Sequence, residues 1–290
     1  MPPNPKAEKL VQRYVDEGKI TDTVGKLYLH KYNINGKVLS LYKKVQRKEN
    51  SPLTQEELRD IDIDLIRWDI KTADQQPLFF RQFPSGEFGS YKVPNFDLHS
   101  LLDIRDYCDA ASTKLGECFS DSEHVKTGKT LLHDAGWDSE TFDKLAACER
   151  GDRDNPTHRY EWGTYAMFCK ENLPHTIVAS THLSSEPELS LRSELMILLL
   201  TIYGKGLKEE CLAHEITPVL LLSIRIEHLR LIEAYYDGSK VIVRFSDPIH
   251  LRLKDSSKQQ QEAVNWVLRW LAATPVGDTS KLSSLKTARS

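Results

Sequence analysis

The sequence predicts an α+β protein in which a helical N-terminal region packs on a helix-flanked, mainly antiparallel β-meander. Two observations carry this prediction. The helix expected over residues 187–203 is almost continuously apolar from Leu195 onward, and residues 216–246 hold three apolar segments of strand length separated by turn residues. Residues 1–94 show the 3.6-residue spacing of surface helices instead.

The central helix is expected over residues 187–203. Ser185 and Glu188 have the spacing of a capping box, in which a hydroxyl and a carboxylate accept the free backbone N–H groups of the first turn. Gly204 can end the helix in the left-handed conformation. From Leu195 onward the segment is apolar on every side, which indicates a buried helix.

Three strands are expected between residues 216 and 246. Residues 216–224 are apolar without alternation, which predicts a strand covered on both faces. Residues 229–236 and 240–246 flank Asp237-Gly238, and this dipeptide favours a hairpin in which both turn positions adopt positive φ. Apolar and polar residues alternate in the third strand, so one of its faces is expected to be partly exposed.

The N-terminal region, residues 1–94, is predicted to contain four short amphipathic helices. They begin near Asn4, Thr21, Val38 and Thr54. Asn35-Gly36 is expected to separate the second from the third, and the fourth is expected to continue to Trp68. Residues 78–93 are expected to form a hairpin with a four-residue loop.

The second predicted domain covers residues 95–275. Helices are expected after Asp138 and Asn155, the latter running through Phe168, and a short strand is expected at residues 176–180. A last helix is predicted to start at Ser257. Residues 276–290 are small and polar, and a disordered tail is expected there.

Composition excludes several classes of function. A net charge of −3 is atypical of a general nucleic-acid-binding protein, which normally carries a basic surplus. The first ten residues lack the apolar core of a secretory signal. Arg192 and Glu194 interrupt the most apolar segment, which therefore falls short of the roughly 20 apolar residues of a membrane span. No membrane association is expected.

The five cysteines are widely spaced and form no close pair. This pattern favours reduced thiols and a cytoplasmic or nuclear protein over a disulfide framework. Zinc ligation was weighed for four residues: Cys108, Cys118, His124 and His133. Their spacing matches none of the close ligand pairs of zinc sites, so buried thiols and surface imidazoles are favoured, and no metal is predicted.

Other motifs support no cofactor. Gly128-Lys129-Thr130 has the ending of a phosphate-binding loop, but the required earlier glycine is replaced by Glu123. Four histidines lie near the ends of the predicted strands: His182, His214, His228 and His250. We expect them mostly at the surface, because the sequence contains no nucleophile elbow that would give them a catalytic role.

The order of a helix, three strands and a final helix resembles the core of PD-(D/E)xK nucleases. This resemblance implies metal-dependent hydrolysis of a phosphodiester, in which Glu194, Glu233 and Asp237 would hold the metal and Lys240 would assist the attacking water. The acid-x-lysine of the third strand is missing, since Arg244 stands where a lysine would be offered. Without such a site, Glu194 is expected on the polar side of its helix.

Residues 189–246 also resemble a recurrent C-terminal pattern in uncharacterised proteins of filamentous fungi. Three segments carry the resemblance: residues 192–195, residues 214–223 and residues 234–238. It implies a lineage-restricted intracellular protein, of the accessory kind that accompanies specialised metabolism, and it assigns no catalytic residue.

Two hypotheses follow. The favoured one is a non-catalytic intracellular protein that binds a protein or small-molecule partner and needs no cofactor. The alternative is a metal-dependent phosphodiesterase with a degenerate nuclease-like core. The position of Glu194, Glu233 and Asp237 separates the two, because a nuclease requires these carboxylates to converge.

Overall fold

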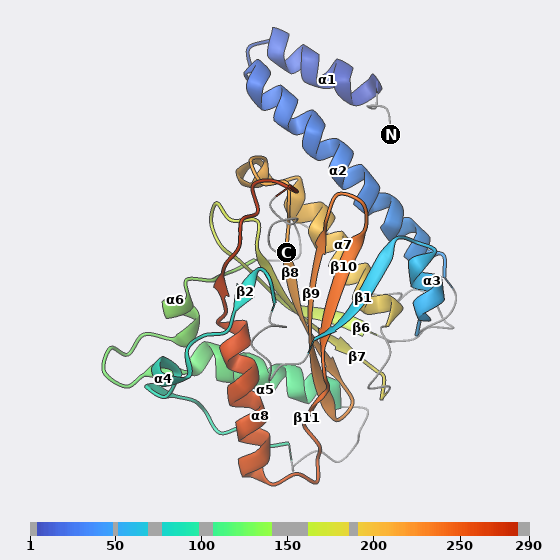
Figure 1. Cartoon of the computed structure of the whole chain (residues 1–290). Coiled ribbons are helices and arrows are strands. Elements are labelled where there is room, and N and C mark those ends of the chain that lie inside the picture. Colours follow the sequence, from blue (N-terminus) through green and yellow to red (C-terminus); the bar gives the residue numbers. More distant parts are fainter. Residues whose placement is uncertain are drawn as a thin grey trace.

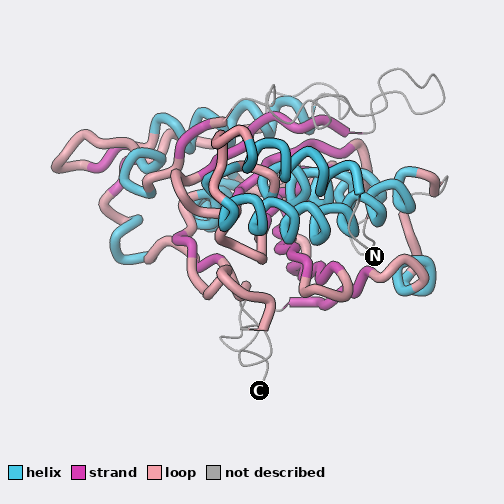
Figure 2. Tube along the Cα trace, turned by 90° about the horizontal axis from the view of Figure 1, so that it is seen from above, coloured by secondary structure: helices cyan, strands magenta, loops and turns pink. Residues whose placement is uncertain are grey.

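The computed structural model describes residues 5–48, 52–68, 77–98, 107–140, 162–185 and 191–283. A mixed sheet lies between two layers of helices (Figure 1), which confirms the α+β class. Helices α2 (Asp22–Gln46) and α7 (Arg192–Gly206) cover one face. Helices α5 (Tyr107–Asp121) and α8 (Ser257–Leu271) cover the other. Seen from above, the helices lie alongside the strands (Figure 2).

The described sheet has eight strands, with the order β1-β10-β9-β8-β7-β6-β5 and β11 paired to β9. The bounds are β1 Ile63–Trp68, β5 Asp138–Ser139, β6 Trp162–Cys169, β7 Thr176–His182, β8 Val219–Arg225, β9 His228–Tyr236, β10 Val241–Ser246 and β11 Ile249–His250. Strands β8, β9 and β10 form the expected antiparallel meander. Strands β7 and β8 are parallel, with α7 as the crossover between them.

Strands β8 and β9 are the centre of the core. Every residue of both strands is buried, as the absence of alternation after residue 216 predicts. Leu221 and Ala234 face α2 and α7, whereas Leu220 and Leu231 face α5 and α8. The two hydrophobic cores are therefore separated only by the sheet itself.

The central helix differs from the prediction at both ends. Helix α7 begins at Arg192 and ends at Gly206, not at residues 187 and 203. Residues 186–190, which include Glu188 of the expected capping box, lie outside the described residues. Gly204 stays helical rather than turning left-handed, and a carboxylate further along, that of Glu194, accepts a free N–H of the first turn.

Helix α2 is continuous over 25 residues, so the break expected at Asn35-Gly36 is wrong. Asn35 is buried beside α7, where an added Cβ on Gly206 would lie 2.6 Å from the Asn35 Oδ1 atom. Tertiary packing thus overrides the weak helix propensity of Asn-Gly. The N-terminal part of α2 and helix α1 (Pro5–Asp16) project beyond the sheet (Figure 1), and no residue of α1 is buried.

The fourth predicted helix is largely a strand. The capping box at Thr54 is present, but helix α3 covers only Gln55–Arg59. Asp62 then turns the chain with φ of 56°, and residues 63–68 form β1, parallel to β10. Trp68 is fully buried, with its ring 5.4 Å from that of Trp270. Burial against α8 and pairing with β10 outweigh the helical spacing of the apolar residues.

The hairpin expected at residues 78–93 does not form. Strand β2 (Phe80–Arg81) pairs with β12 (Thr274–Pro275), and β3 (Tyr91–Lys92) pairs with β4 (Glu123–His124). The residues expected to form the hairpin loop instead form the short helix α4 (Ser85–Phe88). Both segments pair with strands that are distant in the sequence, and the spacing of their residues does not reveal these partners.

Asp138 belongs to β5, so it does not start the expected helix, whose remaining residues lie outside the described part of the chain. The helix expected through Phe168 is strand β6 over its described part. Residues 141–161, with Cys148 and Asn155, lie outside the described residues. The aromatic and branched residues of 162–169 pack on β7, whose predicted position is confirmed. Helix α6 (Leu131–Ala135) lies in the region for which no element was predicted.

The C-terminal segment is ordered as far as residue 283. The backbone N–H of Ile216 donates to Thr279 O over 3.1 Å, and Leu282 N donates to Glu215 Oε2 over 2.7 Å. A disordered tail from residue 276 is therefore wrong for residues 276–283, and residues 284–290 lie outside the described part. The hairpin at Asp237-Gly238 is confirmed, but only Gly238 has positive φ.

The close contact between α2 and α7 can be tested with two glycines. Gly206→Ala should destabilise the protein by about 1–3 kcal/mol, because the new methyl group overlaps Asn35. Gly36→Ala is the control: nothing lies within 4 Å of its added Cβ, so it should stabilise α2 by about 0.5–1 kcal/mol. Urea denaturation measures both, and equal effects of the two substitutions would contradict the packing.

Candidate functional site

Glu194 occupies the third position of α7 and is fully buried. Its Oε2 atom accepts the backbone N–H of Leu191 over 3.0 Å, and its Oε1 atom accepts Arg225 Nη2 over 2.6 Å and Arg225 Nε over 3.1 Å. Arg225 is the last residue of β8 and is also fully buried. The expected position of Glu194 on the polar side of its helix is therefore wrong.

The charges around this pair determine its protonation. Burial is the largest single effect on Glu194 and opposes its ionisation, but the nearby charges and hydrogen bonds, chiefly those of Arg225, together outweigh it and lower the pKa of the carboxyl to about 2. Arg230 of β9 adds a second, weaker contribution. Its own guanidinium lies 5.0 Å from the Phe245 ring centroid. An ionised carboxylate can stay in this core because two guanidinium groups offset its desolvation.

His182 extends the network from β7. Its Nε2 atom lies 2.7 Å from Ser180 Oγ, and its Nδ1 atom lies 2.8 Å from Ser193 Oγ. Burial lowers the pKa of the imidazole to about 4, so the ring is neutral at pH 7. Paired hydroxyl and imidazole groups are the ingredients of nucleophilic catalysis, but His182 and Ser180 are fully buried. The hydrogen bond from His182 to Ser193 therefore holds α7 against the sheet. A substrate in solution could not reach the buried Ser180 and His182.

Glu233 lies on the opposite face of the sheet, because it alternates along β9 with the residues that face α2 and α7. Its carboxylate accepts the backbone N–H groups of Leu78 and Phe79 over 2.9 and 2.8 Å. Burial raises the pKa of Glu233 to about 7, despite these hydrogen bonds and Arg244 at 3.9 Å. Glu233 thus anchors the segment that leads into β2.

The remaining two residues of the nuclease hypothesis are structural. Asp237 Oδ1 accepts the backbone N–H groups of Ser239 and Lys240, both over 3.0 Å, and so forms the hairpin turn. The Lys240 ammonium donates to Asp64 Oδ2 on β1. The structure therefore does not bring Glu194, Glu233, Asp237 and Lys240 together.

The described residues contain no group of three side chains that could hold a metal ion. The four weighed zinc ligands have separate environments. Cys108 and Cys118 are buried and donate to the carbonyls of His182 and Pro94, His124 Nδ1 accepts the Lys126 N–H, and His133 lies beside Asp134. Four cysteines in the described residues are free and buried, as expected: Cys108, Cys118, Cys169 and Cys211.

The loop that resembles a phosphate-binding motif is a turn. Gly128 adopts positive φ, and Thr130 caps α6 by accepting the backbone N–H of His133.

Of the four strand-end histidines, His250 is exposed, whereas His182 and His228 are buried. The expectation that these histidines lie mostly at the surface is therefore wrong for two of them.

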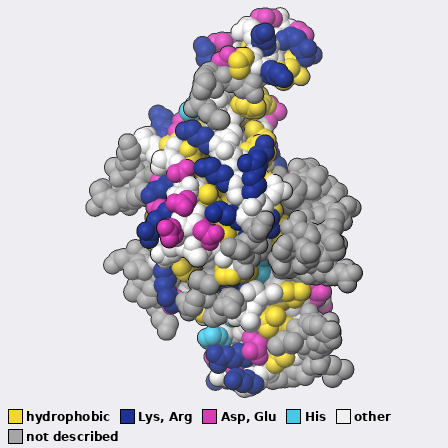
Figure 3. Space-filling model, turned by 90° about the vertical axis from the view of Figure 1, so that its right-hand side faces the viewer, with side chains coloured by type: hydrophobic (Ala, Val, Ile, Leu, Met, Phe, Trp, Pro, Cys, Tyr) yellow, Lys and Arg dark blue, Asp and Glu magenta, His cyan; other side chains and the backbone are white. Residues whose placement is uncertain are grey.

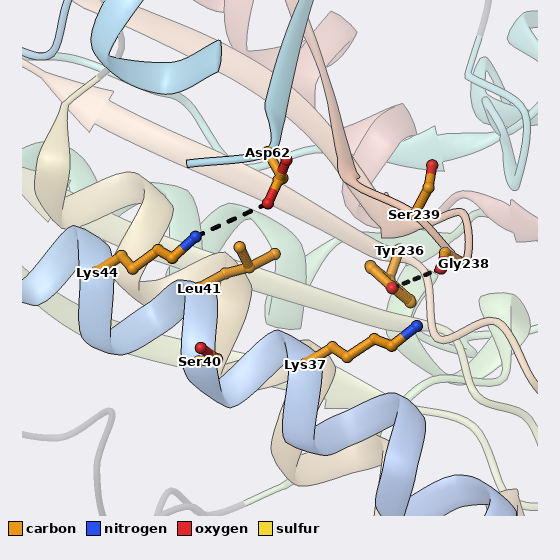
Figure 4. Close-up of a pocket in the computed structure, with 8 residues that line it drawn as sticks. All are labelled: Lys37, Ser40, Leu41, Lys44, Asp62, Tyr236, Gly238 and Ser239. Atoms are coloured by element: carbon orange, nitrogen blue, oxygen red, sulfur yellow. Dashed lines mark hydrogen bonds and ion pairs between the residues drawn. The ribbon is translucent and has the colours of Figure 1, made fainter. Parts of the chain in front are cut away.

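An accessible groove of about 420 Å³ lies between α2 and the β9–β10 hairpin (Figure 4). Its volume falls within the usual range of small-molecule sites. One face of α2 supplies four of its residues at helical spacing: Lys37, Ser40, Leu41 and Lys44. Tyr236, Gly238 and Ser239 from the hairpin and Asp62 from the turn before β1 complete it.

The two lysines of this groove differ in their surroundings. Lys44 Nζ lies 3.8 Å from Asp62 Oδ2, whereas Lys37 forms no ion pair with any described residue and extends toward Gly238 and Ser239 (Figure 4). Tyr236 donates its hydroxyl to Gly238 O over 2.6 Å, and burial raises its pKa to about 12, so it stays neutral. The groove thus offers the Lys37 ammonium, the Lys44 ammonium beside Asp62, and the Ser40 hydroxyl. The Ser239 hydroxyl already donates to Asp237 Oδ1 over 2.8 Å.

The sequence did not single out these groove residues. Lysines spaced along one helix face are usually solvated, and only the return of the β9–β10 hairpin places a wall opposite Lys37. The side of the molecule that carries α2 and α3 shows basic and acidic side chains interspersed (Figure 3).

The comparisons with known proteins add no relative. The chain matches no protein-family model, no curated protein and no solved structure. In the described part of the chain, no helix combines the length and apolar character needed to cross a bilayer.

The buried pair can be tested by substitution. Glu194→Gln should destabilise the protein by about 3–5 kcal/mol, because it leaves the Arg225 charge buried without its partner. Glu117→Gln removes one partner of an exposed pair with Lys114 and should change stability by less than about 1 kcal/mol. Chemical denaturation at pH 7 measures both, and a loss below 1 kcal/mol for Glu194→Gln would refute the buried pair.

The pKa of Glu233 predicts a pH dependence. Its folded pKa, about 7, exceeds the unfolded value, so its stabilising contribution is present below the unfolded value and is lost as pH rises through 7. Glu194 behaves oppositely, losing its contribution as pH falls toward 2. Relative to Glu233→Gln, the wild type should therefore lose stability between pH 5 and pH 8. Parallel pH profiles of the two proteins in urea would contradict this prediction.

Proposed function

We propose that this protein is a non-catalytic binding protein whose groove between α2 and the β9–β10 hairpin takes a small anionic ligand. The observation that carries the proposal is Lys37, a cation without a carboxylate partner among the described residues, placed over a hollow of about 420 Å³. Lys44 and the Ser40 hydroxyl line the same hollow. Phosphate and carboxylate groups are the ligands that such donors bind.

Its setting is proposed to be intracellular, in the cytoplasm or nucleus. The four free, buried thiols support this, since they suit a reducing compartment. The resemblance of residues 189–246 to proteins of filamentous fungi extends the proposal to an accessory role in specialised metabolism. The partner in that role would be the anionic small molecule of the groove or a protein that carries it.

A metal-dependent phosphodiesterase is less well supported. The carboxylates that it would need lie in three places: under α7, behind the sheet at Leu78, and in the hairpin turn. Each already accepts hydrogen bonds from protein groups. A metal would have to displace these donors, one of which is the buried Arg225.

The groove is tested by calorimetric titration of pyrophosphate and citrate. We expect saturable binding that weakens at least about tenfold in Lys37→Glu, because the substitution replaces an attractive charge by a repulsive one. Lys258→Glu, on the exposed side of α8, should bind like the wild type. Absence of binding, or equal weakening in both variants, would refute the proposed groove.

The nuclease alternative is tested with divalent metal. Millimolar Mg²⁺ or Mn²⁺ should change Tm by no more than about a degree, since metal that binds only the folded state at a hundredfold excess over Kd would add about 2.7 kcal/mol. A shift of several degrees together with metal-dependent cleavage of DNA or RNA would establish the alternative and overturn the non-catalytic proposal.

A further inference from the structure

Strand β1 ends the described sheet, with β10 on one side and no strand of the described chain on the other. The Asp62 carbonyl accepts the Val241 N–H over 3.0 Å, which fixes the orientation of the parallel ladder. Backbone groups alternate in direction along a strand, so Asp64 and Ile66 bond to β10. The N–H and C=O groups of Ile63 and Leu65 therefore point to the outer edge.

These outward groups have no hydrogen-bond partner among the described residues. A row of unpaired backbone groups is a template for another strand. Natural sheets protect such edges with proline, a bulge or an inward-pointing charge. Strand β1 has no proline, keeps a regular register with β10 over six residues, and exposes Ile66. Its two charged residues are already paired, Asp64 with Lys240 and Arg67 with Asp247.

A groove of about 220 Å³ runs beside this edge, between β1 and α3. Its lining is mixed: Gln55, Arg59 and Asp64 are polar, whereas Leu65 is a half-buried apolar residue. Leu58 of α3 and Ile63 of β1 lie almost fully buried at its base. A strand laid along β1 would direct alternate side chains into this hollow, because side chains alternate between the faces of a sheet. The hollow and the unpaired edge thus fit the same occupant.

The charge at the groove selects that occupant. Arg59 lines it and forms no ion pair with a described residue; among the described residues its guanidinium donates only to the neutral Gln55 Oε1 atom, over 3.4 Å. Asp64 also lines the groove, but Lys240 already neutralises it. The net charge left over is positive and comes from a guanidinium, which suits a carboxylate.

We propose that the β1 edge and the α3 groove bind an extended acidic peptide segment, which adds a strand to the sheet. The partner's backbone would pair with Ile63 and Leu65, an apolar side chain would enter the hollow beside Leu58, and a carboxylate would meet Arg59. This surface shares no lining residue with the groove at Lys37, so the two proposals can fail separately.

The test uses capped, fluorescein-labelled hexapeptides in which valine alternates with threonine, with one threonine replaced in turn by glutamate, alanine or lysine. Fluorescence anisotropy with the full chain should show saturable binding in the order glutamate, alanine, lysine. Arg59→Glu should weaken the glutamate peptide at least about tenfold and reverse the order, whereas Arg13→Glu, on exposed helix α1, should leave the order unchanged.

Backbone pairing is tested by N-methylation of alternate amides in the glutamate peptide. Only one of the two alternating sets faces β1, so one methylated isomer should lose at least about tenfold in affinity and the other should not. Equal affinity of the two isomers would overturn the added strand. Absence of saturable binding, or sedimentation as a dimer that the peptide does not dissociate, would assign the edge to no peptide or to a second copy and overturn the proposal.

Discussion

The structure depends on one buried ion pair, between Glu194 in the first turn of α7 and Arg225 at the end of β8. Both strands at the centre of the sheet are covered on both faces, so α7 must be apolar around its whole circumference. An all-round apolar helix has no polar side to set its rotation. The Glu194 carboxylate provides that reference, because it bonds to Arg225 and to the backbone N–H of Leu191, the N-cap residue of its own helix.

The layers outside α7 follow from its position. Gly206 lets α2 approach closely enough for Asn35 to lie against it, and α2 then places Lys37 and Lys44 opposite the β9–β10 hairpin. On the other face of the sheet, the Glu233 carboxylate accepts the backbone N–H groups of Leu78 and Phe79 and so fixes the segment before β2. The carboxylates of Glu194 and Glu233, which the nuclease hypothesis assigned to a metal, therefore hold backbone N–H groups in place. The accessible ammonium groups of Lys37 and Lys44 lie at the edge of the molecule.

The sequence predicts the centre of this fold well and its edges poorly. Continuous apolar segments identified α7 and β8, because burial on both faces leaves a pattern that needs no partner to interpret. The Asp237-Gly238 turn between two apolar segments identified β9 and β10. Strands β1 and β6 were predicted as helices, since their apolar spacing fits both periods and only pairing with β10 and β7 decides between them. The same limit hid both grooves, whose walls come from segments far apart in the chain.

The role of Glu194 illustrates why sites are harder to predict than elements. A glutamate followed by leucine and methionine in a helix is compatible with a metal ligand, a solvated charge or a buried cap. The deciding partner, Arg225, lies 31 residues away on the neighbouring strand. Neither spacing nor composition reports that contact, and the surrounding burial changes the group from a chemical candidate into a structural one.

The most direct test of this account is a double-mutant cycle on Glu194 and Arg225. Each residue is replaced alone and together, as Glu194→Leu and Arg225→Met, and the free energies of unfolding are measured in urea. If the pair is structural and buried, each single change should destabilise strongly, and the double variant should recover at least about 2 kcal/mol relative to the sum of the two. Additive effects within about 0.5 kcal/mol would show that the two groups do not interact and would contradict the account.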